Sequence, residues 1–138
     1  VLVVNEDRKK ISSRVAMEQC VQTSTTFASW VEKAKKDFVL MKEALKEADF
    51  EKIGEITESN ALAMHETTTT SSPSFTFLTE ESHRAMDIVK QLRSQGYKCY
   101  FTMDAGPNVK VLYLKKDQDK IYEEISKLWN KKIILCME

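Results

Sequence analysis

The 138-residue sequence has few of the residues that mark glycine-rich, metal-binding or membrane-spanning proteins. It has three glycines and two prolines, and no cluster of glycines that would form a phosphate-binding loop. His65 and His83 are not spaced as a ligand pair, so no metal site is predicted. No apolar run approaches the roughly 20 residues of a membrane span, and no signal peptide is visible.

An excess of charge is also absent, because 21 Lys and Arg residues balance 21 Asp and Glu residues. A neutral chain has no bulk attraction for nucleic acid or an anionic membrane, so we expect neither as a partner, and any anion must be bound locally. Cys20, Cys99 and Cys136 lie in apolar stretches without CxxC spacing. We therefore expect reduced, buried thiols in a cytoplasmic protein.

The length fits one domain, and a hydrophobic content of 42 % is enough for a core. The sequence begins without Met and inside an apolar, β-rich run at residues 1–4. This start favours a fragment of a longer protein.

Helices are predicted to dominate the first half of the chain, after a short buried strand at residues 1–4. Ser12 or Ser13 can cap the first helix, and Asp49 can cap the third. Residues 67–74 predict a hydroxyl-rich loop. The second helix carries apolar side chains at helical spacing, which we expect to lie in the core: Phe27, Trp30, Val31, Ala34, Phe38, Met41, Leu45 and Ala48.

The second half mixes helix and strand. Thr79 caps a fourth helix, which ends at Gly96. Residues 97–103 and 109–114 then predict two strands, followed by a helix and a last strand at residues 133–137. The order β-α-α-α-α-β-β-α-β predicts an α+β fold, with an antiparallel sheet covered by helices.

The turn between the two central strands, residues 104–108, is the first candidate site. Gly106 permits a positive φ, Pro107 fixes φ, and Ala105 keeps side-chain bulk away. A ligand could then approach the main chain while Asp104 points out from a strand end. An ordinary hairpin loop, in which Asp104 accepts bonds from its own turn, would use the same residues, and the sequence leaves both interpretations open.

The start of the first helix is the second candidate. Ser12, Ser13 and Arg14 combine hydroxyls and a guanidinium with free helix amides, which suits phosphate binding. A capping serine followed by a solvent-exposed arginine is the alternative. His65, near a predicted helix end, is interpreted as a cap or packing residue.

Four segments carry a family resemblance: ISSR at residues 11–14, DFEKIGE at 49–55, NALAMH at 60–65 and FTMDAGPNVKV at 101–111. Taken together and in this order, they resemble the bacterial diphosphomevalonate decarboxylases, members of the GHMP kinase superfamily. Two departures from the family pattern are Ala16, where the family usually has Gly, and Glu66, where it has Ala. Glu66 adds a charge that would alter the geometry near the site.

The resemblance implies a GHMP kinase C-terminal domain, ferredoxin-like in fold, over residues 1–138, and a homodimeric enzyme. It implies an ATP-dependent reaction in which the 3-hydroxyl of mevalonate 5-diphosphate is phosphorylated, phosphate leaves and CO2 is lost, giving isopentenyl diphosphate. ATP and Mg²⁺ would be the cofactors of the full-length enzyme. The chain lacks the superfamily's phosphate loop, so we expect it neither to bind ATP nor to catalyse the reaction alone.

The family's catalytic aspartate falls on Asp104, which would orient the 3-hydroxyl and take its proton, with Ala105 and Gly106 forming the supporting turn. Ser13 and Arg14 fall where the family contacts the substrate's diphosphate. One substrate can reach both places only if the Ser13 hydroxyl and the Asp104 carboxylate lie within about 10 Å of each other. The alternatives are a small-molecule kinase of the same superfamily and an α+β binding or regulatory module without chemistry.

Overall fold

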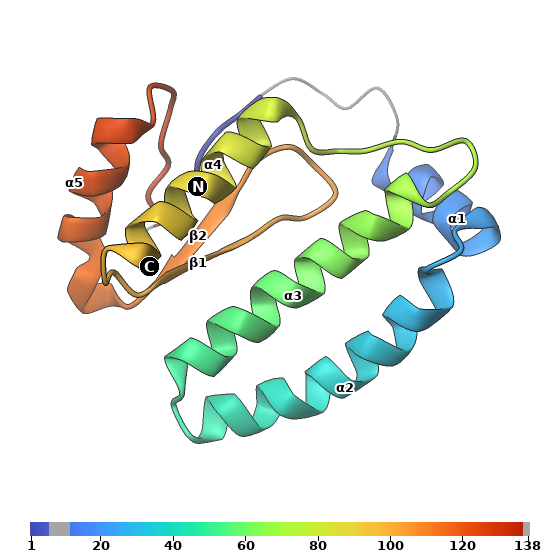
Figure 1. The fold of residues 1–138 in the computed structure, drawn as a ribbon, viewed down its shortest axis with the longest axis horizontal. Coiled ribbons are helices and arrows are strands. Elements are labelled where there is room, and N and C mark those ends of the chain that lie inside the picture. The colour runs from blue at the N-terminus through green and yellow to red at the C-terminus, as the bar shows by residue number, and fades with distance from the viewer. Residues whose placement is uncertain (6–11, 137–138) are drawn as a thin grey trace. The chain divides into compact units, whose positions relative to one another are not determined.

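The computed structural model describes residues 1–5 and 12–136 of the chain. They belong to two compact units, which we describe separately (Figure 1). The sheet unit comprises Val1–Asp7 and Leu78–Glu138, and the helical unit comprises Arg8–Phe77.

Three helices form the helical unit: α1 (Ser13–Thr23), α2 (Phe27–Lys46) and α3 (Phe50–Thr69). The predicted caps are confirmed for two of them. The Ser12 hydroxyl accepts a hydrogen bond from the Val15 N–H at 3.3 Å, and the Asp49 carboxylate accepts one from the Lys52 N–H at 3.1 Å. Each bond satisfies an amide that has no partner within its own helix turn.

A buried carboxylate links α2 to α3, which pack along one another. Asp37 is 8 % exposed and accepts hydrogen bonds from Lys33 Nζ at 2.7 Å and from Asn60 Nδ2 at 2.9 Å. The ammonium compensates the buried charge and the amide satisfies a second lone pair, which is what such a group requires.

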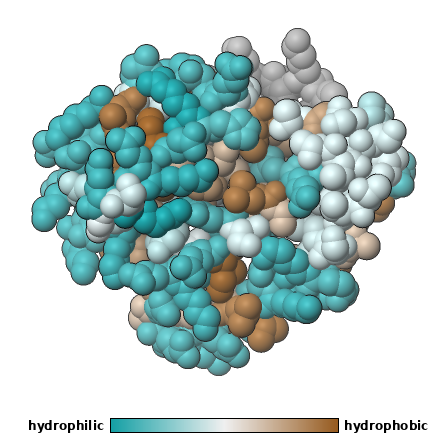
Figure 2. Space-filling view, viewed as in Figure 1, coloured by the Kyte–Doolittle hydropathy of each residue, from teal (hydrophilic) through white to brown (hydrophobic). Residues whose placement is uncertain are grey.

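The expectation that the whole apolar stripe of α2 lies in the core is wrong. Phe38 is 64 % exposed and Leu45 is 59 % exposed, whereas Ala44 is fully buried. A helix that packs mainly against one neighbour buries a narrow line of side chains, and the stripe is wider than that line. Hydrophobic groups accordingly reach the surface among hydrophilic ones in Figure 2.

The predicted loop at residues 67–74 begins too early, because α3 continues to Thr69. Thr67 and Thr68 are fully buried, and their hydroxyls donate to the carbonyls of Met64 and His65 at 2.6 and 2.7 Å. These bonds satisfy the hydroxyls inside the helix, so a run of threonines does not end it here. His65 is 4 % exposed and packs edge-on against the Phe77 ring, in agreement with a packing role.

The sheet unit contains α4 (Glu80–Ser94), β1 (Cys99–Thr102), β2 (Lys110–Tyr113), a 3₁₀ turn (Lys115–Asp117) and α5 (Gln118–Leu128). β1 and β2 pair antiparallel, with α4 packed on β1 and on α5. The predicted α+β class is therefore confirmed. Gly96 ends the α4 segment at φ +95°, a conformation that favours glycine.

The predicted outer strands are reduced to single bridges. Leu2 pairs with Val109 on one side and with Ile133 on the other, both antiparallel. The spatial order is therefore Ile133, Leu2, β2, β1. Pairing ends at Val4 because its N–H donates to the Asn108 side chain at 2.8 Å instead of to a strand. Met137, at the end of the last predicted strand, lies outside the described residues.

Two of the three cysteines are buried as expected, Cys20 and Cys99, but Cys136 is exposed. The expectation is wrong for Cys136, which lies beyond the backbone bonds that hold this segment at Ile133 and Ile134. Over residues 1–5 and 12–136, no helix is both long and apolar enough to cross a membrane.

Candidate functional site

The loop that joins β1 to β2 carries the candidate aspartate. Asp104 lies just beyond the end of β1, with its side chain 69 % exposed. The Gly106 N–H donates to the Asp104 carbonyl at 2.7 Å, which closes a tight three-residue turn around Ala105. Such turns commonly have a negative φ at the centre. The freedom to adopt positive φ is not used at Gly106, since the described residues with positive φ are Ala48 and Gly96.

Two side chains anchor this loop, Ser82 of α4 and the loop's own Asn108. The Ser82 hydroxyl, in the first turn of α4, donates to the Pro107 carbonyl at 2.6 Å. The Asn108 side-chain oxygen accepts from the N–H groups of Val4 and Asn5 at 2.8 and 3.1 Å. The loop is thereby tied to a helix on one side and to the N-terminal segment on the other.

Lys110 forms an ion pair with Asp104. Lys110 Nζ lies 2.8 Å from Asp104 Oδ2, and the two side chains are 45 % and 69 % exposed. An exposed pair of this kind contributes about 1 kcal/mol or less, so a ligand can displace the ammonium at little cost. Asp104 therefore presents a carboxylate that is already balanced by a cation and remains open to solvent.

The second candidate, at the start of α1, lies in the helical unit. Ser12 is the capping residue, which makes Ser13 the first residue of the helix. The Arg14 side chain is 89 % exposed and lies 3.6 Å from the Glu18 carboxylate, which is itself 62 % exposed. Because Ser13 and Asp104 belong to different units, their proximity stays a prediction.

The two departures from the family pattern lie on helices of the same unit. Ala16 is 3 % exposed within α1, where a methyl group fits the packed interior. Glu66 is exposed near the end of α3, and its carbonyl accepts from the hydroxyls of Thr69 and Thr70 at 3.0 and 2.9 Å. Glu66 therefore disturbs neither the helix nor its core.

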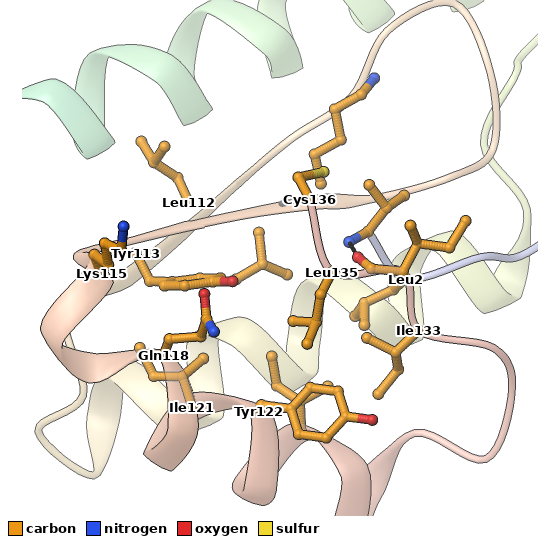
Figure 3. A pocket seen from close by; sticks show the side chains of 15 residues that line it. Leu2, Leu112, Tyr113, Lys115, Gln118, Ile121, Tyr122, Ile133, Leu135 and Cys136 are labelled. Atoms are coloured by element: carbon orange, nitrogen blue, oxygen red, sulfur yellow. Dashed lines mark hydrogen bonds between the residues drawn. The ribbon is translucent and has the colours of Figure 1, made fainter. Parts of the chain in front are cut away.

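A hollow of about 640 Å³ in the sheet unit lies between α5 and the strand β2 (Figure 3). Its lining is mostly apolar, with Ile121, Tyr122 and Leu135 turned toward the space. Burial raises the pKa of the Tyr113 phenol at its edge. Lys110 also lines it, whereas Asp104 does not, so the hollow adjoins the aspartate without containing it.

The roles of three residues around this loop were not predicted: Lys110, Ser82 and Asn108. Lys110 lies six residues beyond Asp104, where only the pairing of β2 with β1 shows that it turns back toward the aspartate. For Ser82 a sequence signal existed, because it stands three residues after Thr79, the position of a capping-box partner. Its bond to Pro107 spans 25 positions and has no sequence signal.

Comparison with known proteins gives consistent matches. The family model of the mevalonate 5-diphosphate decarboxylase C-terminal domain matches residues 1–135. A mevalonate pyrophosphate decarboxylase structure from Streptococcus pyogenes superposes with a TM-score of 0.89 at 53 % identity, covering 94 % of this chain and 41 % of that one. The diphosphomevalonate decarboxylase of Candida albicans is 32 % identical over 122 residues, which are 88 % of this chain and 34 % of the relative.

A further structure, described as "MDDEF in complex with MVAPP, AMPPCP and Magnesium", has a TM-score of 0.89 at 42 % identity and covers 94 % of this chain and 40 % of that one. The chain thus spans between 34 % and 41 % of the length of these relatives.

Proposed function

The chain belongs to the mevalonate 5-diphosphate decarboxylase family, whose C-terminal domain it matches, and we propose that it is one C-terminal domain of an enzyme that decarboxylates mevalonate 5-diphosphate in an ATP-dependent reaction. The domain has the fold of the GHMP kinase superfamily. The product would be isopentenyl diphosphate, within the mevalonate pathway of isoprenoid biosynthesis.

The observation that carries this proposal is the setting of Asp104. Its carboxylate is exposed at a strand end, on a loop tied down at Pro107 and Asn108, with Lys110 at 2.8 Å. A fixed, accessible carboxylate can accept a hydrogen bond from the 3-hydroxyl and take its proton as phosphate is transferred. The hydroxyl is a far weaker acid than a carboxylic acid, so orienting it should matter more than basicity.

Ser13 and Arg14 are proposed to hold the diphosphate. The guanidinium can donate two parallel bonds to phosphate oxygens, and the N-terminal end of α1 adds a partial positive charge. Support comes from the exposure of Arg14, whose partner Glu18 is also exposed and lies at 3.6 Å. This leaves the guanidinium accessible to an anion.

ATP and Mg²⁺ are proposed as cofactors of the complete enzyme, held by residues outside this chain. The chain itself does not fit them: its three glycines, Gly54, Gly96 and Gly106, are far apart and form no phosphate loop. Among the described residues, no group of three or more His, Cys, Asp or Glu side chains is placed to hold a metal ion. We propose that this chain contributes the residues that bind and orient the substrate and accept the proton of its hydroxyl.

The remaining proposals concern the setting of the enzyme. We propose a cytoplasmic homodimer that acts as a lyase on a small anionic substrate, with neither nucleic acid nor membrane as a partner. The balanced charge supports the absence of nucleic acid and membrane partners, and the two buried thiols support the cytoplasmic setting.

The substitution Asp104→Asn in the full-length enzyme tests the proposal. It removes the proton acceptor but keeps the shape of the side chain, so we expect kcat to fall by about 10²–10⁴-fold with substrate affinity little changed. Production of isopentenyl diphosphate and of ADP should be measured separately. A variant that keeps more than about a tenth of the wild-type kcat would contradict the role of Asp104. ADP formation without CO2 release by the wild-type enzyme would identify a kinase instead.

A further inference from the structure

Ser82 combines two hydrogen-bonding roles at the start of α4. Its hydroxyl oxygen accepts from the Thr79 N–H at 3.0 Å, while the Thr79 hydroxyl oxygen accepts from the Ser82 N–H at 3.3 Å. These reciprocal bonds form a capping box, which satisfies two helix amides. The same Ser82 hydroxyl donates to the Pro107 carbonyl at 2.6 Å, in the loop that carries Asp104.

The directions of these bonds are fixed. A carbonyl oxygen only accepts, so the single hydroxyl proton of Ser82 must go to Pro107. The Thr79 and Ser82 hydroxyl oxygens lie 3.2 Å apart, so Thr79 must be the donor between them. The network therefore runs one way, from Thr79 through Ser82 to Pro107.

The residue type at position 82 is informative for this reason. Glu or Gln is the usual residue at this place in a capping box. A carboxylate at position 82 would accept from Thr79 equally well, but it has no proton to donate to Pro107. A short hydroxyl serves both purposes, and Ser82 is fully buried, so water does not substitute for it.

We propose that Ser82 is a positioning residue for Asp104, an inference that rests on the proposed function of this site. Pro107 lies three residues beyond Asp104, and between them the Gly106 N–H donates to the Asp104 carbonyl at 2.7 Å. The bond from Ser82 holds the Pro107 carbonyl against α4 and so fixes one end of the bend. Asp104, which carries the carboxylate, is at the other end. Loss of the Ser82 bond frees a carbonyl and allows the bend to shift.

The test compares Ser82→Ala with Thr79→Ala in the full-length enzyme. Each variant breaks one of the two reciprocal bonds of the capping box and should destabilise α4 by a similar amount, but only Ser82→Ala releases Pro107. We expect Ser82→Ala to lower kcat roughly 10- to 100-fold, since a displacement of about 1 Å at a reacting group has effects of this size. Thr79→Ala should stay within about threefold of the wild type, and Ser82→Thr, which keeps the hydroxyl, should recover most of the loss. Ser94→Ala, an exposed serine of the same helix, is the matched control.

A double variant separates positioning from general destabilisation. If Ser82 acts through Asp104, Ser82→Ala should lower kcat less than threefold in an Asp104→Asn background. Equal losses in Ser82→Ala and Thr79→Ala, or a full further loss in the double variant, would overturn the proposal. Failure of Asp104→Asn to lower kcat would instead overturn the proposed function.

Discussion

At the scale of single residues, short polar side chains accept hydrogen bonds from backbone N–H groups at helix starts and in loops. Ser12 and Asp49 satisfy helix amides, and the Asn108 oxygen accepts from the N–H groups of Val4 and Asn5. Bonds of this kind each contribute about 1 kcal/mol. Their larger effect at the loop of Asp104 is geometric, because they fix where the carboxylate lies.

Arg14 is predicted to determine affinity for the substrate. In the full-length enzyme, Arg14→Met should raise the KM for mevalonate 5-diphosphate about 10- to 100-fold, because it removes two charge-assisted bonds to phosphate. The pair with Glu18 is too exposed to compete with this, at about 1 kcal/mol or less. Steady-state kinetics at saturating ATP measures the change. Lys36→Met, which removes one exposed positive charge from α2, is the control and should leave KM unaltered.

An unchanged KM in Arg14→Met would contradict the role of Arg14 in binding the diphosphate.

An experimental structure of the complete enzyme gives a second check. It should place the Ser13 hydroxyl within about 10 Å of an Asp104 carboxylate oxygen, since one extended substrate has to touch both. Placement of the two side chains on opposite faces would contradict the assignment of Ser13 and Arg14.

At the scale of elements, the helices α2 and α3 are joined by a buried polar group as well as by apolar contact. Asp37 is buried between α2 and α3 and accepts from Lys33 and Asn60. Much of the apolar surface of α2, including Phe38 and Leu45, lies outside this contact. The polar link therefore adds a bond between the two helices that apolar contact alone does not supply.

Asp37→Ala is predicted to lower the free energy of unfolding by about 1–3 kcal/mol, because it leaves the Asn60 amide without its acceptor and the Lys33 ammonium without its counter-charge. Urea unfolding followed by circular dichroism measures this change. Asp87→Ala is the matched control, since it removes an exposed pair with Lys90 and gains the same helix propensity. If both variants have the same stability, the buried link contributes nothing.

At the scale of the whole molecule, we predict that this chain carries residues for the substrate and does not bind the nucleotide by itself. Calorimetry of the isolated chain, Val1 to Glu138, with ATP and Mg²⁺ should show no binding tighter than about 100 µM, although circular dichroism should show a folded protein. Its three separated glycines cannot form the backbone cradle that holds phosphates. The full-length enzyme, titrated under the same conditions, is the positive control. Binding by the isolated chain would mean that its residues hold the nucleotide.

Local patterns predicted the helices and the two central strands, but not that the outer strands would shrink to single bridges. The helix starts at Ser12, Asp49 and Thr79 and the end at Gly96 follow from bonds within four residues of each position. The two-residue period of residues 97–103 likewise predicted β1. Burial was predicted less well, as Phe38 and Cys136 show, because it depends on which neighbour covers a side chain.

The sequence by itself determined the class of fold, the family and the position of the turn that bears Asp104, because these depend on local propensity and on motifs in order. The tertiary structure decided what surrounds that carboxylate. Lys110 reaches it through strand pairing. The loop is held by the bond from Ser82 to Pro107, 25 positions apart, and by the bond from Val4 to Asn108, 104 positions apart. Such bonds form only once the chain has folded and brought distant segments within 3 Å, so no spacing in the sequence encodes them.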